Sequence, residues 1–131
     1  MDSLKSLLPR DKFDNSTIDN LSQLTDNEIQ PIIGNLIECL QDYNWPIAKD
    51  ILPIVVLHQN VAMTHILDIL QGNDVMWQYW IIELVIPYLI SPNKRLLEKE
   101  LERLASTTIT NEDLEIIVEK ANWCISFYYA K

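Results

Sequence analysis

The chain has 131 residues and a mass of 15.3 kDa, which suits one domain whose core needs no disulfide or metal support. Apolar residues make up 48% of the chain and charged residues 22%, and these proportions exclude a disordered protein. Ten Lys and Arg against nineteen Asp and Glu give a formal net charge of −9. This charge argues against nucleic acid and anionic membranes as direct partners and permits a basic protein partner.

Apolar residues recur at helical spacing, and no segment longer than four residues resembles a strand. Thr25 and Glu28 form a capping box, and we expect Asn44, Asn73, Ser91 and Thr110 to begin later helices. Gly72 is expected to end the fourth helix. The expected helices cover residues 15–24, 26–41, 45–57, 61–71, 74–89, 93–105 and 111–129.

Short connections between these helices predict that successive helices are antiparallel neighbours. A shift of 34 residues superposes Pro53 on Pro87 and aligns the apolar positions around them, which is typical of a repeat with two helices per unit. We therefore expect an all-α fold, a small HEAT-like α-solenoid in one domain over residues 1–131. An N-terminal cap segment over 1–24 precedes stacked pairs over 25–131: 26–41 with 45–57, 61–71 with 74–89, and 93–105 with 111–129. The alternative is a closed helical bundle without a concave face.

The cellular compartment is predicted from the lack of recognisable targeting and membrane-spanning segments. The first 20 residues hold no apolar segment behind a basic start, so we expect no signal peptide and a cytoplasmic location. Cys39 and Cys124 match no metal or redox spacing, which favours free thiols. The most apolar segment, Val75 to Ile90, is shorter than the ~20 residues that span a bilayer and contains Glu83, so we expect no membrane span.

Three motifs resemble a known family. Residues 7–14, LLPRDKFD, are similar to a PRDK signature followed by an acid, and residues 41–49, QDYNWPIAK, are similar to a QDxNWPxAK signature. Residues 77–81, WQYWI, are similar to an aromatic run that opens the family's central helix. The family is a small, all-helical, mostly bacterial group described as a domain of unknown function. The resemblance, from about residue 7 to residue 105, implies a HEAT-like fold and no reaction.

The PRDK segment offers one candidate binding site. Arg10, Asp11 and Lys12 could dock a carboxylate or phosphate, because Arg presents a planar fork of donors. In the structural interpretation, which we favour, Asp11 or Asp14 caps the first helix and Arg10 pins the segment to an acid such as Asp42.

A second candidate site combines the other two motifs. Helical spacing places Trp45 and Lys49 on one face, and the 34-residue shift superposes Lys49 on Glu83, so these two side chains could meet. The result is either a Trp-rimmed polar pocket or, as we favour, a salt bridge beneath packed indoles. The candidate binding residues are Arg10, Asp11, Lys12, Asp42, Trp45, Lys49, Trp77, Trp80 and Glu83.

No catalytic constellation, metal set or cofactor loop is recognisable, so we expect no enzyme, no metal and no cofactor. His58 and His65 lie seven residues apart without the three or four convergent ligands that a metal site requires. The aromatic tail of Phe127, Tyr128 and Tyr129 either packs on the preceding helix, which we favour, or forms an exposed patch for a partner.

These patterns predict a non-catalytic, acidic helical-repeat protein that binds another protein, of the immunity or adaptor type. The expected partner is basic, because residues 1–91 carry four cations and twelve acids, net −8. The alternative is a small-molecule binder or enzyme that uses a Lys49/Glu83 pocket. The aromatic tail leaves self-association open, so we expect a monomer or a weak homodimer.

Overall fold

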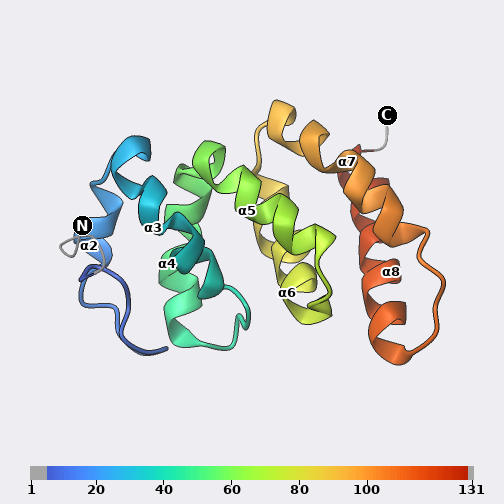
Figure 1. Cartoon of the computed structure of the whole chain (residues 1–131), viewed down its shortest axis with the longest axis horizontal. Coiled ribbons are helices and arrows are strands. Elements are labelled where there is room, and N and C mark those ends of the chain that lie inside the picture. The colour runs from blue at the N-terminus through green and yellow to red at the C-terminus, as the bar shows by residue number, and fades with distance from the viewer. Residues whose placement is uncertain (1–5, 130–131) are drawn as a thin grey trace. The chain divides into compact units, whose positions relative to one another are not determined.

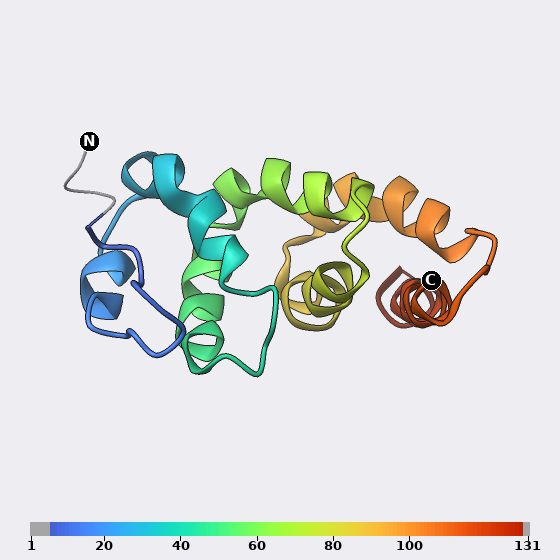
Figure 2. The ribbon, with the colours of Figure 1, turned by 60° about the horizontal axis from the view of Figure 1, so that its bottom comes forward.

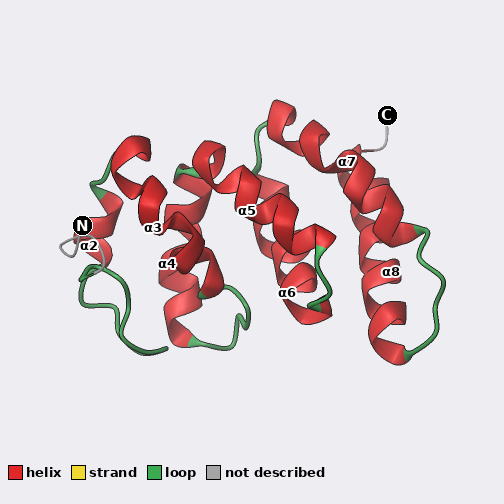
Figure 3. Cartoon of the chain, viewed as in Figure 1, coloured by secondary structure: helices red, strands yellow, loops and turns green. Residues whose placement is uncertain are grey.

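The computed structural model describes residues 6–129, and all the regular structure in that part of the chain is helical (Figures 1 and 3). This confirms the all-α class. Two of the helices continue without interruption into irregular turns. The elements are α2 (Ile18–Ser22), α3 (Asp26–Glu38), α4 (Pro46–Leu57), α5 (Gln59–Gln71), α6 (Val75–Trp80), the π-helical turn η1 (Ile81–Val85), the 3-10 turn η2 (Ile86–Tyr88), α7 (Ser91–Ala105), α8 (Glu112–Cys124) and the π-helical turn η3 (Ile125–Tyr129).

The chain divides within α5, between His65 and Ile66, into two compact units. Unit 1 takes in α2, α3, α4 and the first half of α5, and unit 2 takes in the remainder. The solenoid and the single domain stay predictions.

Unit 1 is built around α4, against which both α2 and α3 pack. The predicted capping box is present at the start of α3: Thr25 Oγ1 accepts from the Glu28 backbone N–H at 3.2 Å, and Glu28 Oε1 accepts from the Thr25 N–H at 2.9 Å. The hydrogen bonds that the Glu28 carboxylate accepts from Thr25, chiefly from its backbone N–H, hold the pKa of Glu28 below its usual value. The apolar core of the unit consists of fully buried side chains, among them Leu21, Ile29, Ile33, Leu36, Ile37, Ile51 and Val55.

The start of α4 differs from the prediction by one residue. Trp45, not Asn44, is the N-cap, and its side chain makes no capping hydrogen bond. Asn44 lies in a local turn, in which its N–H donates to Asp42 Oδ1 at 2.8 Å, and α4 begins after Trp45. The loop before α2 compensates: the Ile47 N–H, in the first turn of α4, donates to the Lys12 carbonyl at 2.9 Å. This loop therefore runs beside the beginning of α4 (Figure 2).

In unit 2, the helix predicted over 74–89 is interrupted. It begins as expected after a capping side chain, but the cap is Asp74 instead of Asn73 and accepts from the Trp77 N–H at 3.1 Å. After α6 the chain passes through η1 and η2. Pro87 lies in η2 and has no N–H to donate, so a regular α-helical ladder cannot continue through it.

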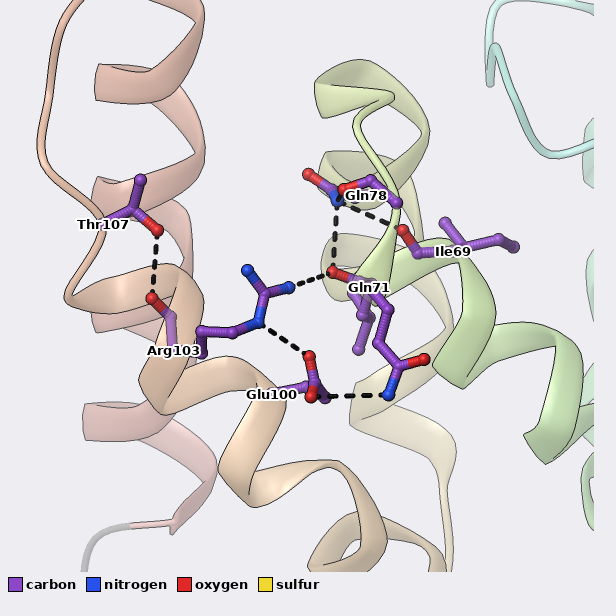
Figure 4. Close-up of polar contacts among 8 residues, drawn as sticks. Ile69, Gln71, Gln78, Glu100, Arg103 and Thr107 are labelled. Atoms are coloured by element: carbon purple, nitrogen blue, oxygen red, sulfur yellow. Dashed lines mark hydrogen bonds and ion pairs between the residues drawn. The ribbon is translucent and has the colours of Figure 1, made fainter.

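The C-terminus of α5 is capped by side chains. Gly72 lacks the positive φ of the expected glycine cap. Instead the buried Gln78 amide donates to the carbonyls of Ile69, Leu70 and Gly72 at 3.1, 3.2 and 2.9 Å. Arg103 of α7 donates to the Leu70 carbonyl at 2.8 Å (Figure 4). Two distant side chains thus satisfy the carbonyls that a helix end leaves without partners.

Two antiparallel helices complete unit 2. α7 begins at Ser91 with Ile90 as its N-cap, so Ser91 is inside the helix and not the cap we expected. α8 begins after Asn111, not Thr110: Asn111 Oδ1 accepts from the Leu114 N–H at 2.8 Å. Both α6 and α7 pack against α8. The buried side chains on α7 and α8 include Leu97, Leu101, Leu104, Ile117, Val118, Ala121 and Cys124.

Within residues 6–129, no single helix is both long enough and apolar enough to cross a bilayer. α4 and α5 pass that test only when they are taken together, and they are bent by 115° at the break between them.

Candidate functional site

An open pocket of about 560 Å³ lies in unit 1, where the loop before α2 meets the turn between α3 and α4. The PRDK loop forms one part of it, and the stretch from the end of α3 to the beginning of α4, which is distant from that loop in the sequence, forms the other. The lining residues are Pro9, Asp11, Lys12, Glu38, Cys39, Gln41, Trp45 and Ile47. The structure therefore brings Asp11, Lys12 and Trp45 from two predicted binding motifs together in one pocket.

The PRDK loop is closed on the carboxylate of Asp14. This carboxylate accepts from the Arg10 N–H and Nε at 2.9 and 3.2 Å, and from the Ser16 N–H and Oγ at 3.2 and 2.6 Å. The hydrogen bonds from Ser16 and Arg10 hold the pKa of Asp14 well below its usual value. Arg10 is thus pinned to Asp14 and not to Asp42, and the N-cap of α2 is Thr17, not Asp11 or Asp14.

Asp42 shapes the opposite side of the pocket without lining it. Its side chain accepts from the Asn44 N–H, and its carbonyl accepts from the Trp45 N–H at 3.0 Å. This turn directs the chain into α4 and places the half-buried Trp45 at the pocket. Lys49, one turn along α4, is exposed, and its Nζ lies 5.9 Å from the ring centroid of Tyr43.

The pocket offers binding groups and no activated nucleophile. Burial, with a smaller contribution from Glu38, raises the pKa of Cys39 to about 11, so this thiol is uncharged at neutral pH. Pro9, Cys39, Trp45 and Ile47 give an apolar lining, while Asp11, Glu38 and Lys12 add charges. This combination suits an apolar group with a cation beside it.

In unit 2, Glu83 has a partner that the sequence reasoning did not identify. Its Oε1 forms an ion pair with Lys120 Nζ, from α8, and this ammonium lies over two rings, 3.8 Å from the centroid of Trp123 and 4.9 Å from that of Tyr79. The expected pairing was with Lys49, which belongs to unit 1. The cation that an acid in an apolar helix requires is thus supplied within the same unit.

Residues 7–125 match the domain of unknown function DUF5071, which is most of the chain. The chain belongs to this family. No match was found among the curated proteins.

The remaining candidate tryptophans, Trp77 and Trp80, belong to unit 2, whereas Trp45 belongs to unit 1. Trp77 Nε1 is buried and has no hydrogen-bond partner in the described part of the chain. Trp80 makes an edge contact with Tyr79, at 5.2 Å between ring centroids and 86° between planes. Neither residue lines the pocket of unit 1.

The two histidines contact other residues of unit 1. His58 is buried, and its Nδ1 lies 2.6 Å from Asp26 Oδ1 in the first turn of α3. The His65 ring lies against the helix face at Gly34, where an added Cβ would come within 2.8 Å of His65 Cε1. Among residues 6–129, no group of three or more His, Cys, Asp or Glu side chains could hold a metal ion.

Proposed function

We propose that this protein is a non-catalytic binding module that recognises a segment of another protein through the pocket of unit 1. The carrying observation is the open apolar lining, with Trp45 and Ile47 beside the carboxylates of Asp11 and Glu38. An apolar side chain of the partner gains about 1.5–3 kcal/mol when it is fully buried in such a pocket. The carboxylates favour Lys or Arg next to that anchor.

The charge of unit 1 supports a basic partner. Residues 1–65 carry four Lys and Arg against nine Asp and Glu, net −5. A surface potential of this sign accelerates the encounter with a basic protein and weakens as salt is added. More specifically, we propose an immunity-type or adaptor role, because a protein of either type acts by binding its partner and catalyses no reaction.

Site-specific photo-cross-linking in cells that express the protein tests the proposal. A benzoylphenylalanine probe replaces Gln41, which lines the pocket, or Gln23, an exposed residue of unit 1 that does not line it. We expect one protein to cross-link at position 41 and not at position 23, and the product to disappear with Trp45→Ala. Circular dichroism checks that this variant is folded. Equal products at both positions, or none at position 41, contradict the proposal.

A small apolar ligand is the second candidate for the same pocket, because about 560 Å³ lies within the range that small-molecule sites occupy. A pocket that uses Lys49 and Glu83 has less support, because Glu83 forms an ion pair with Lys120. Ligand-observed NMR with a fragment library separates the two ideas. Fragments that bind only with Trp45 present, together with no cross-linked protein, favour the small molecule.

A further inference from the structure

The solvent face of α8 carries large apolar side chains. The helix buries Ile117, Val118, Ala121 and Cys124, and the 3.6-residue period places Glu112, Ile116, Glu119 and Trp123 on the opposite stripe. Ile116 is 40% exposed, Trp123 is 39% exposed, and Phe127, in η3, is 68% exposed. A helix at a protein surface normally keeps this stripe polar, so the packing of unit 2 does not account for the apolar surface that these three residues leave exposed. We call Ile116, Trp123 and Phe127 the apolar stripe of α8.

The apolar stripe is held in place by its neighbours. Trp123 stacks on Phe127 at 5.7 Å and 23°, and Tyr128 makes edge contacts with both rings. Tyr129 anchors the end of η3, because its hydroxyl donates to the Lys94 carbonyl of α7 at 2.7 Å. Part of the tail therefore packs on the preceding helix through Tyr129, whereas Phe127 is exposed. Rings that are fixed before binding lose little conformational entropy when a partner arrives.

The α8 side of the stripe is acidic, and one lysine of α7 lies close to the aromatic cluster, with Lys94 Nζ 5.3 Å from the ring centroid of Tyr128. A shallow pocket of about 210 Å³ lies between α6 and α8 and is lined by Tyr79, Ile116, Glu119, Lys120 and Trp123. The ammonium of Lys120, the cation of α8, is already engaged by Glu83 and by the rings beneath it. Four carboxylates of α8 are exposed and form no ion pair with the described cations of the chain: Glu112, Asp113, Glu115 and Glu119.

We propose that this face binds a basic amphipathic helix of a partner protein, at a site separate from the pocket of unit 1. Apolar residues of the partner, three and four positions apart, would pack on the apolar stripe, and its Lys and Arg would meet Glu112 and Glu119. The competing occupant is a second copy of this chain, because Leu96 on α7 is 63% exposed and is followed by the exposed Lys99. The experiment distinguishes these occupants.

Fluorescence anisotropy with two labelled peptides tests the proposal on the full chain. One peptide of about 14 residues places Leu at helical spacing among Lys residues, and its control has Glu in place of Lys. We expect saturable binding of the Lys peptide and none of the Glu peptide. Glu119→Lys should weaken binding about tenfold, and Ile116→Ser should weaken it comparably, because each removes one element of the complementarity.

Asp19→Lys is the matched control, because it changes the net charge equally at an exposed position of unit 1. We expect it to change the affinity by less than about twofold. Equal weakening by Asp19→Lys and Glu119→Lys overturns the proposal, since binding would then follow net charge alone. A dimer in analytical ultracentrifugation that both Glu119→Lys and Lys99→Glu dissociate also overturns it, in favour of the second copy. Trp45→Ala should leave peptide binding unchanged, which separates this site from the proposed function of unit 1.

Discussion

The side-chain cap of α5 leads to a quantitative prediction for Gln78→Met. The amide of Gln78 has two hydrogens, which it shares among three carbonyls at 2.9–3.2 Å, and the side chain is 2% exposed. Methionine keeps the length and much of the volume of glutamine, so the cavity contribution is small. The loss is then two hydrogen bonds of about 0.5–1.5 kcal/mol each, plus the cost of carbonyls left without a donor. We expect the free energy of unfolding to fall by about 2–4 kcal/mol.

Urea denaturation followed by circular dichroism measures this loss, and hydrogen exchange locates it. Amides in the last turn of α5 should exchange faster in the variant than amides in the middle of α3. Gln71→Met is the control, because Gln71 is exposed and makes a single 3.5 Å hydrogen bond to Glu100 (Figure 4). It should cost less than about 0.5 kcal/mol. A Gln78→Met protein within about 0.5 kcal/mol of the wild type would refute the reasoning, because water would then satisfy the carbonyls equally well.

Three further predictions concern ionisable groups. Burial raises the pKa of Cys39 and of Cys124 to about 11. At pH 8 both thiols should therefore react with Ellman's reagent roughly 100-fold more slowly in the native protein than in the urea-unfolded protein. A ratio of the two rates below about ten contradicts this prediction. The pKa of Asp14 is lowered by folding, so its contribution to stability is present above its ordinary value of 3.8 and is lost as the pH falls through its folded value. The deficit of Asp14→Asn should therefore shrink below pH 3.8, and a deficit that does not depend on pH would exclude this origin. In a double-mutant cycle, Glu83→Gln should couple to Lys120→Gln by about 1 kcal/mol or less, since Glu83 is 40% exposed; coupling to Lys49→Gln instead would restore the pairing expected from the repeat.

The positions of the helices could be predicted from the sequence because their signals are local. The Thr25–Glu28 capping box lies within one turn, and both of its hydrogen bonds form. The boundaries were less accurate where a local turn precedes a helix: Asn44 is a good N-cap by composition, but it lies in the turn formed with Asp42, and Trp45 is the N-cap. The interruption after Trp80 was missed, although Pro87 was visible, because the sequence does not show whether a helix kinks or changes its hydrogen-bond pattern.

The contacts of the sites were harder to predict because they join distant segments. The pocket of unit 1 depends on the hydrogen bond between Lys12 and Ile47, which no spacing rule indicates. Glu83 could be recognised as an acid that needs a cation, but the repeat suggested Lys49, and Lys120 lies 37 residues away in a helix outside that comparison. Gln78 lies in the apolar segment from Val75 to Ile90, and nothing in its spacing indicates that it caps another helix.

The carboxylates of this chain fall into two classes, and the division bears on both proposed surfaces. One class is used by the fold: Asp14 closes a loop, Glu28 caps a helix and Glu83 pairs with a lysine. The carboxylates in the first turn of α8 form no ion pair with the described cations, but the dipole of the helix stabilises them there. Glu119 lies beyond the first turn, beside Ile116 and Trp123, and a cation of the proposed partner would pair with it. Both proposed surfaces thus place exposed carboxylates beside apolar side chains, and a basic, partly apolar segment of a partner would complement this combination.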